Sequence, residues 1–523
     1  MSSALLTGSE PQRSARTVQS VDPVTGTVWR EYAAAGPAEV RAAVERARAT
    51  QPAWAALPVS KRADALGRFH AALVRRRHDV ADVLTRETGK ATADATSSEI
   101  LTTLDFARFF AREAVRLQRA PWRRAASLSM FRKRVRIEHM PLGVVCVISP
   151  WNYPFMLAAG VVLPALVTGN AVVLKPSELT PTSGVILGEL LAEAGIPDGV
   201  LSVLPGDGAT GAALTSSEVD KVFFTGSVGT GRKVAVACAA LGIAYSLELG
   251  GNDAAIVLAD ANLATAARGI AWGRFTNAGQ SCVAPKRVFV VDAVYDRFMA
   301  VLRTEVEAPA PMGDGGAASQ PLIRQAQADV LEAQLADALA LGARVVARAS
   351  ERAASGAAFP PTVIADATPA MRVMREETFG PLLPVVRVRD AEDAIARANA
   401  SDYGLSASIW TKDLARGIEV ADRIDAGTVC INDVLVVAGM ADVPHGGVKG
   451  SGTGRSHGVA GLLECVRTKT IVAERWNGWR QPWWSSSTAE QARGLDAFVQ
   501  LAHGSSLLAR LRGVAGTIRM LRR

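Results

Sequence analysis

The sequence predicts an α/β protein made of two doubly wound parallel-sheet domains and a small projecting β element. The chain has 523 residues, enough for roughly three or four folding units at about 150 residues each. Its 46 Gly and 25 Pro indicate many tight turns, and its 49% hydrophobic and 21% charged residues are typical of a globular protein. Segments typical of strands and helices alternate along most of the chain, as they do in doubly wound sheets.

The first part of the chain is predicted to be helical. Apolar residues recur there at helical spacing, and Pro37 and Pro58 stand near the expected helix starts. We therefore expect surface helices over residues 37–50, 59–88 and 96–118.

The next segment, from Pro141 to Leu174, has no charged residue over 34 positions. Its length would span a bilayer, but prolines and glycines interrupt it too often for one continuous helix. We interpret it as a buried parallel β-α-β unit with a strand at 143–149, a helix at 156–168 and a strand at 171–174.

The alternation of strands and helices continues beyond this unit. We expect a helix at 182–194, a strand at 200–204, a helix at 208–215, a strand at 220–224, a helix at 229–240 and a strand at 244–248. A second series of strands, near 254–258, 287–291, 361–364, 384–388, 405–410 and 428–431, predicts a second α/β domain. Ligands of such sheets bind at the carboxyl ends of the strands.

Residues 131–137 form a separate pattern, in which arginines at 132, 134 and 136 alternate with apolar residues. Alternation predicts a two-faced strand rather than a basic helix. Such a strand can project from the domain and pair with another subunit.

Charge and cysteine content exclude several classes of protein. The formal net charge is +8, but the basic residues concentrate in 112–136 and 504–523, and the remainder carries −5. This distribution argues against a nucleic-acid-binding core, and it leaves two interpretations of the basic segments, a solvated surface or an anionic partner. The five cysteines show no CxxC spacing, so neither a disulfide framework nor a zinc site is indicated, and a cytoplasmic location is expected because no secretory signal opens the chain.

Two loops that follow predicted strands are suited to a dinucleotide. Phe-Thr-Gly-Ser at 224–227 leads through small residues into a helix, whose N-terminal amides can approach a phosphate. Lys175 and Glu178 follow a neighbouring strand, where a carboxylate can accept from ribose hydroxyls. A plain turn and solvated loop charges are the alternative interpretations, and the two loops together favour the dinucleotide.

Two residues are candidates for covalent chemistry. Cys282 lies in a loop of small polar residues, whereas buried structural cysteines usually lie within apolar strands. Glu248 ends an apolar strand 34 residues upstream and is either a salt-bridged structural residue or a general base with a raised pKa.

At these residues the chain resembles the aldehyde dehydrogenase superfamily, and the resemblance runs from about Asp22 to Thr470. Two segments, Trp-Gly-Arg-Phe at 272–275 and Cys-Val-Ala-Pro at 282–285, are most similar to the branch that contains fatty and aromatic aldehyde dehydrogenases. The motifs, in order, are Pro-Trp-Asn-Tyr-Pro at 150–154, Lys-Pro-Ser-Glu at 175–178, Phe-Thr-Gly-Ser at 224–227, Leu-Glu-Leu-Gly-Gly at 247–251, Gly-Gln-Ser-Cys at 279–282, Glu-Glu-Thr-Phe-Gly-Pro at 376–381 and Gly-Gly-Val-Lys-Gly-Ser-Gly at 446–452.

The resemblance implies NAD(P)-dependent oxidation of an aldehyde to its carboxylic acid. Cys282 would be the nucleophile, Glu248 would activate the hydrolytic water, and Asn152 with the Cys282 backbone N–H would form the oxyanion hole. A thioester on the cysteine would be the intermediate, and no metal has a role. Rival functions are a CoA-acylating dehydrogenase, which commonly lacks the glutamate, and a non-catalytic scaffold, which the intact catalytic residues make a weaker interpretation.

The resemblance also implies residues for the cofactor, with NAD expected over NADP because Glu178 should disfavour a 2′-phosphate. NADP remains possible, since relatives with a glutamate here can use both. The cofactor-binding residues carried over are Trp151, Lys175, Ser177, Glu178, Gly208, Gly226, Ser227, Leu249, Glu377 and Phe379.

The substrate is expected to be an uncharged, mostly apolar small-molecule aldehyde. Thr276 stands where semialdehyde-specific relatives carry an arginine, and His445 stands where the family usually has Phe. His445 is either a neutral lining residue or a polar contact to substrate, and Asn252-Asp253 replaces a commoner Lys-Ser pair. The predicted substrate tunnel is formed by Tyr153, Leu157, Thr276, Val283 and His445.

In this family the chain divides into two Rossmann-like domains and an oligomerisation element. The predicted boundaries are 1–125 with 142–250 for the NAD-binding domain, 251–465 for the catalytic domain, 126–141 with 466–475 for the oligomerisation strands, and 476–523 for a C-terminal extension. Projecting strands that extend a partner's sheet imply a homodimer or a dimer of dimers.

The extension is rich in Trp and Arg. Trp476, Trp479, Trp483 and Trp484 lie within nine positions, and Leu507, Leu511, Val514, Ile518 and Leu521 recur on one side of a predicted helix. Two interpretations are open. The extension contacts an anionic membrane peripherally, or it packs on its own dimer, which Gly513 and Gly516 favour because they weaken an isolated helix by about 1 kcal/mol each.

Overall fold

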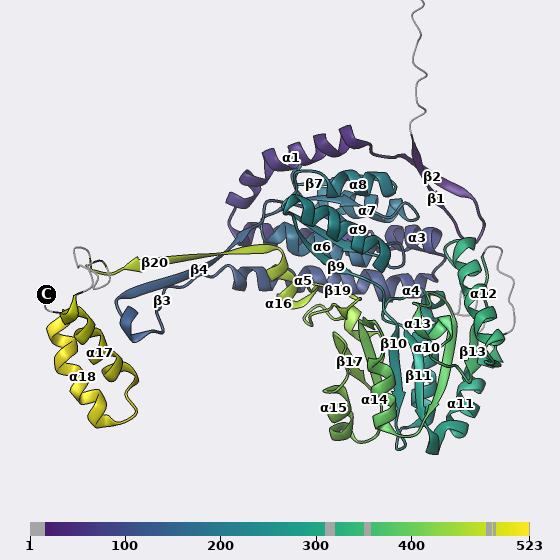
Figure 1. Cartoon of the computed structure of the whole chain (residues 1–523). Helices are drawn as coiled ribbons and strands as arrows, with labels where there is room; N and C mark the ends of the chain where they lie inside the picture. Colours follow the sequence, from purple (N-terminus) through teal and green to yellow (C-terminus); the bar gives the residue numbers. More distant parts are fainter. Residues whose placement is uncertain (1–15, 309–319, 350–356, 477–483, 485–487, 522–523) are drawn as a thin grey trace, which may run out of the picture. The chain divides into compact units, whose positions relative to one another are not determined.

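The computed structural model describes residues 16–308, 320–349, 357–476, 484 and 488–521, and these form two compact units. The first unit comprises residues 1–117 and 140–467, and the second comprises 118–139 and 468–523. Figure 1 shows both sheets of the first unit with helices packed beside their strands. The α/β class predicted from the sequence is confirmed.

The first sheet of this unit has the strand order β19-β9-β8-β5-β6-β7, and only β19 is antiparallel to its neighbour. Its strands are β5 (Val144–Ile148), β6 (Ala171–Lys175), β7 (Leu201–Val203), β8 (Lys221–Thr225), β9 (Ala244–Glu248) and β19 (Gly452–Thr453). The helices that belong with it are α1 (Pro37–Ala56), α2 (Val59–Arg75), α3 (Arg77–Thr88), α4 (Thr92–Ala95), α5 (Thr102–Leu117), α6 (Pro154–Val167), α7 (Pro181–Glu193), α8 (Gly208–Thr215), α9 (Val228–Leu241) and α16 (Gly458–Glu464).

The uncharged stretch is explained by burial on both faces of this sheet. Val145 and Val147 of β5 belong to the hydrophobic core that includes Phe155 of α6, whereas the alternate residues Val144 and Cys146 belong to the core beneath α1. Successive strand residues point to opposite faces, so every position of β5 must be apolar.

The second sheet has the order β12-β13-β14-β11-β10-β16-β17, and only the edge strand β12 is antiparallel. Its strands are β10 (Asp253–Val257), β11 (Pro285–Val291), β12 (Arg344–Arg348), β13 (Thr362–Ala365), β14 (Leu382–Val388), β16 (Ser406–Trp410) and β17 (Thr428–Ile431). Its helices are α10 (Leu263–Phe275), α11 (Tyr295–Glu307), α12 (Gln325–Ala340), α13 (Arg372–Arg375), α14 (Ala391–Asn399) and α15 (Leu414–Ala421).

The structure differs from the sequence prediction at several elements. The single helix expected at 59–88 is wrong, because the backbone leaves helical geometry at Arg76 (ψ 15°) and separates α2 from α3. The guanidinium of Arg76 pairs there with Asp79 and Glu189. The helix expected from residue 96 instead begins with a π-helical turn, Thr96–Leu101. The edge strand β12, the hairpin of β1 (Thr17–Val21) and β2 (Val28–Ala33), and the pair of β15 (Tyr403–Gly404) and β18 (Val448–Lys449) had no sequence prediction.

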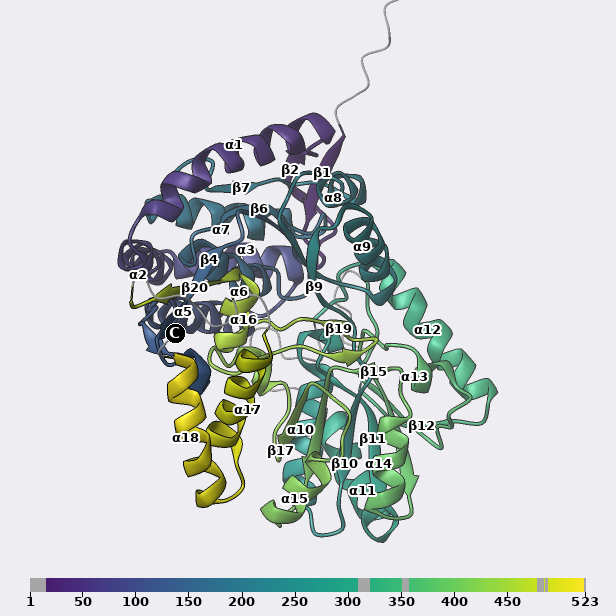
Figure 2. The ribbon, with the colours of Figure 1, turned by 60° about the vertical axis from the view of Figure 1, so that its left-hand side comes forward.

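The second unit contains a three-stranded sheet in the order β20-β4-β3 and a helical hairpin. Its elements are β3 (Arg123–Arg124), β4 (Lys133–Pro141), β20 (Val466–Glu474), α17 (Ala489–His503) and α18 (Leu507–Leu521). Just before β4, the guanidinium of Arg132 lies 4.3 Å from the ring centroid of Trp476. Figure 2 shows α17 and α18 side by side. Among the described residues no helix has the length and apolarity needed to cross a membrane.

Candidate active site

The loop that carries Cys282 is held in an unusual backbone conformation. It follows α10 and contains three successive residues with positive φ, Asn277 (53°), Ala278 (52°) and Gly279 (72°). A Cβ on Gly279 would lie 2.5 Å from the carbonyl carbon of Gly380, so only glycine fits there. The Asn277 side chain fixes the turn by donating to the carbonyl of Gln280 at 3.1 Å.

Asn152 is tied to the same loop. Its side-chain amide donates one hydrogen bond to the carbonyl of Gln280 at 3.1 Å, and its backbone carbonyl accepts from the Asn277 side chain at 3.0 Å. A primary amide carries two N–H donors, so one N–H of Asn152 remains for a further acceptor. The loops of Asn152 and Cys282 therefore hold each other in register.

A buried ion pair supports Asn152 from behind. The Lys90 ammonium pairs with Glu99 and also donates to the backbone carbonyl of Asn152 at 2.7 Å. The other oxygen of Glu99 accepts from the backbone N–H groups of Phe155 at 2.9 Å and Met156 at 3.3 Å, in the first turn of α6. A carboxylate is favoured at a helix N-terminus, so this pair fixes both α6 and the loop before it.

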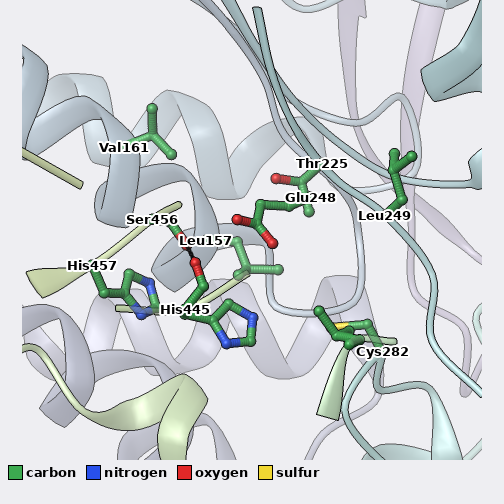
Figure 3. Close-up of a pocket in the computed structure, with 10 residues that line it drawn as sticks. Leu157, Val161, Thr225, Glu248, Leu249, Cys282, His445, Ser456 and His457 are labelled. Atoms are coloured by element: carbon green, nitrogen blue, oxygen red, sulfur yellow. Dashed lines mark hydrogen bonds between the residues drawn. The ribbon is translucent and has the colours of Figure 1, made fainter. Parts of the chain in front are cut away.

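Glu248, at the end of β9, has its carboxylate in a small cavity of about 20 Å³ that Cys282 also borders. Figure 3 shows the Glu248 carboxylate directed into this cavity, which Cys282 and His445 also line. Its Oε2 has no hydrogen-bond partner among the described residues. Burial raises the pKa of Glu248 well above its usual value, and Arg455 acts in the opposite direction.

The thiol of Cys282 is neutral in this environment. Burial raises its pKa to about 12, although the nearby Lys286 favours the thiolate. The Lys286 ammonium donates to the Cys282 carbonyl at 2.6 Å and to the Ser281 carbonyl at 3.0 Å, and it lies 3.8 Å from a Glu377 oxygen. Lys286 thus anchors the backbone of the cysteine loop rather than the sulfur.

The Asn252-Asp253 pair, noted above as a departure, joins this buried network. The Asn252 amide donates to the carbonyls of Met374 at 3.1 Å and Glu376 at 3.2 Å. Asp253 accepts from the Ser406 hydroxyl at 2.5 Å, and burial raises its pKa to about 6. These contacts brace the segment before Glu377.

The predicted cofactor residues lie at the carboxyl edge of the first sheet and in the adjoining loops. Lys175 ends β6, its ammonium donates to the Gly206 carbonyl at 2.7 Å, and it lies 3.6 Å from the half-exposed carboxylate of Glu178. Ser227 begins α9, and its hydroxyl accepts from the Thr230 N–H at 3.3 Å. Trp151 and Ser177 follow β5 and β6, Gly208 begins α8, and Gly226 follows β8.

The remaining cofactor candidates approach from the second sheet. Glu377 accepts from the Gly251 N–H at 3.0 Å, next to Leu249, and a Cβ on Gly250 would lie 2.0 Å from its Oε2. The Phe379 and Trp151 rings meet edge to face at 5.4 Å. No heavy atom would lie within 4 Å of a Cβ at Gly208 or Gly229, so the helix starts at α8 and α9 are open. An open helix N-terminus, the half-exposed carboxylate of Glu178 and the carboxylate of Glu377 between the sheets fit a dinucleotide.

All five residues of the predicted tunnel line one larger cavity. Tyr153, Leu157, Thr276, Val283 and His445 border a space of about 480 Å³ that reaches Cys282. The sequence prediction missed further lining residues, among them Lys90, Asp94, Met156, Trp272, Asp433 and Val434. Lys90, Asp94, Asp433 and Val434 lie far from the catalytic motifs in sequence, whereas Met156 stands two residues after Pro154 and Trp272 ten residues before Cys282, where proximity could have indicated them.

His445 is buried between the two cavities. Burial and Arg455 lower its pKa to about 4, so the imidazole is neutral. Its ring stacks on that of His457 with centroids 5.5 Å apart. A neutral side chain agrees with the interpretation of His445 as a lining residue.

Known proteins resemble this chain over most of its length. The model of the aldehyde dehydrogenase family matches residues 10–471. The chain is 37% identical over 502 residues to a 4,4′-diapolycopene aldehyde oxidase of Methylomonas sp, covering 94% of this chain and 93% of the relative. It is 37% identical to the succinate-semialdehyde dehydrogenase [NADP(+)] of Escherichia coli K12, covering 86% and 93%. A crystal structure of a Mycobacterium tuberculosis aldehyde dehydrogenase complexed with NAD+ superposes with a TM-score of 0.83 at 33% identity, covering 90% and 97%.

The raised pKa of Cys282 predicts slow alkylation in the absence of cofactor. With the pKa moved from its usual value to about 12, the thiolate is scarce below that pH and the rate should rise throughout pH 7–10. Iodoacetamide labelling, followed by peptide mass spectrometry, should be about a hundredfold or more slower at pH 8 than for a free cysteine. A labelling rate that levels off near pH 8 would contradict the buried neutral thiol, and the Cys282→Ser protein controls for the other cysteines.

Proposed function

Because the chain belongs to the aldehyde dehydrogenase family, we propose that it oxidises an uncharged, largely apolar aldehyde to the carboxylic acid with NAD(P) as acceptor. The observation that carries this proposal is the position of Cys282, which borders both the small cavity of Glu248 and the larger, mostly apolar cavity. A thiol between a carboxylate and an apolar tunnel is suited to form an acyl intermediate that water then hydrolyses.

The first step is addition of Cys282 to the aldehyde. The thiol proton passes to Glu248, whose raised pKa makes it a better acceptor than an exposed carboxylate, and the sulfur forms a bond to the carbonyl carbon. The carbonyl oxygen becomes an alkoxide. The free N–H of Asn152 and the backbone N–H of Cys282 donate to it, and each such donor contributes about 3 kcal/mol.

The second step releases the acid. Bound NAD(P), which Leu249, Glu377 and Phe379 would hold on its nicotinamide side, would supply the hydride acceptor that converts the adduct on Cys282 into a thioester. Glu248 first releases the former thiol proton to solvent. Its carboxylate then takes a proton from water, and the oxygen of that water adds to the thioester carbon. The carbon–sulfur bond then breaks, and Cys282 leaves as a thiolate while the carboxylic acid forms. A CoA-acylating reaction would not need a carboxylate to activate water at this position.

The charges around the larger cavity support an uncharged substrate. Lys90 is the one cation among its described lining residues, and Glu99 neutralises it. The lining also carries Asp94 and Asp433. The carboxylate of a semialdehyde would therefore be repelled by Asp94 and Asp433. It would also find no unpaired cation among the described lining residues, whereas binding of a semialdehyde requires one.

A panel of aldehydes tests the reaction. Aliphatic and aromatic aldehydes with NAD should produce NADH, and kcat/KM should be at least tenfold higher for them than for succinate semialdehyde, because the cavity offers the carboxylate no cation. Cys282→Ser should abolish turnover. Absence of NADH with every aldehyde would overturn the proposal, and thioester formation that depends on added CoA would favour the acylating alternative.

Lys90 is predicted to act as a positioning residue through Asn152. In the Lys90→Met/Glu99→Gln protein both buried charges are removed together, and kcat should fall about a hundredfold because one oxyanion donor loses its fixed place. KM for the cofactor should not change. Lys61→Met, at an exposed ion pair with Asp64, is the matched control. An unaltered kcat in a correctly folded double variant would refute this role.

Glu178 is predicted to select NAD. Replacing Glu178 by Ala should lower the ratio of kcat/KM for NAD to that for NADP about tenfold, since the carboxylate no longer repels the 2′-phosphate or accepts from the ribose. Initial rates with both cofactors measure the ratio. Glu31→Ala, at an exposed position of β2, should leave it unchanged, and an equal ratio in the two variants would mean that Glu178 does not contribute to selection.

The chain is predicted to form a homodimer or a dimer of dimers. In the order β20-β4-β3 the nine-residue strand β20 is an edge, and among the described residues it pairs with β4 alone. An open edge of this length is usually covered by another chain. Multi-angle light scattering should give two or four times the mass of one chain, and a monomer at micromolar concentration would exclude this assembly.

A further inference from the structure

The hairpin of α17 and α18 is packed through small residues. Gly494 and Thr517 are buried between the helices. A Cβ on Gly513 would lie 2.4 Å from the carbonyl oxygen of Ala497, and one on Gly516 would lie 2.4 Å from the Ala497 Cβ. The two glycines, which the sequence alone interprets as weakening a helix, are therefore what allows the helices to approach closely.

The large apolar side chains of the hairpin lie on the outside. Leu507, Leu511 and Ile518 recur at helical spacing on α18 and are 76%, 59% and 44% exposed. Their positions are far around the helix from Gly513 and Thr517, which contact α17. The face formed by Leu507, Leu511 and Ile518 is called the apolar face of α18 below. Leu495, Val499 and Leu508 are also exposed. A hairpin that functions free in water would bury leucines and expose small residues, so this arrangement indicates that something covers the apolar face.

The second unit is also strongly basic. Its residues 118–139 and 468–523 contain sixteen Arg and Lys against four Asp and Glu, a formal charge of +12, which leaves −4 for the rest of the chain. From Gly504 to the end of the chain there are five arginines and no acidic residue. Arg510 and Arg512 are exposed, and around the helix axis Arg510 lies about 80° from the centre of the apolar face on one side and Arg512 about 120° on the other.

We propose that the apolar face of α18 docks on the surface of a bilayer that contains anionic phospholipid. An apolar helix face bordered by arginines matches the two layers of such a surface, acyl chains below and negative headgroups above. A second copy of the chain is the less suitable occupant, since it would bring another unit of the same positive charge to the interface. The helix lies on the membrane and does not cross it. This inference goes beyond the proposed function, which requires no membrane.

Vesicle co-sedimentation with the full-length protein tests the proposal. The vesicles contain phosphatidylcholine alone or with phosphatidylglycerol, at low and at high salt. The double variant Leu507→Asp/Leu511→Asp is compared with Leu414→Asp, which changes a leucine of the first unit that is 60% exposed. Both substitutions lie outside the active site, so aldehyde turnover and melting temperature should match those of the unaltered protein.

The unaltered protein and Leu414→Asp should pellet with the anionic vesicles at low salt, more weakly at high salt, and little with phosphatidylcholine alone. The double variant should partition at least tenfold less. Equal binding by all three proteins, or no binding, would overturn the proposal. A smaller oligomer in the double variant by light scattering would also overturn it, because a second copy would then cover the face. These outcomes do not depend on whether the chain oxidises aldehydes.

Discussion

The buried contact between Lys90 and Glu99 is the interaction on which the arrangement of the site depends. Removing two charges from water is costly, and the pair is tolerated because both residues have further partners, which for Lys90 include the Tyr153 ring at 4.0 Å from its Nζ to the ring centroid. Lys90 donates to the Asn152 carbonyl, and Glu99 accepts from the first turn of α6. A helix start, an oxyanion donor and the wall of the substrate cavity are thus fixed by one ion pair.

The rest of the site follows from two loops that cannot move independently. Asn277 and Gln280 connect the turn before Cys282 to the loop of Asn152, so the proposed nucleophile and the proposed oxyanion donor keep a constant separation. Lys286 and Glu377 brace the other side of the cysteine loop. Burial then sets the protonation states, with a neutral thiol at Cys282 and a Glu248 carboxyl whose pKa is raised. Preorganised donors and tuned acids of this kind are what acyl transfer through a thioester requires.

Much of this could be predicted from the sequence, because the signals are local. Strands such as β5 and β6 are continuous apolar runs, and Cys282 and Glu248 stand at the ends of recognisable segments. Lys90 could not be predicted, since its partner Asn152 is 62 residues away and nothing near Lys90 marks it. The break at Arg76 and the glycine contacts of α18 likewise depend on neighbours that only the fold brings together. Trp479 and Trp483 of the extension lie outside the described residues.

The central claim is that an acyl group passes through Cys282 and leaves with the help of Glu248. It is tested most directly by intact-mass spectrometry of the Glu248→Gln protein mixed with NAD and an apolar aldehyde. Glutamine cannot activate the hydrolytic water, so the thioester should persist, whereas acylation should only be slowed because solvent can take the thiol proton in place of Glu248. The protein should therefore gain the mass of the aldehyde less two hydrogens, on the peptide that contains Cys282. An unmodified protein that has nevertheless produced NADH, or the same adduct on another cysteine, would contradict the account.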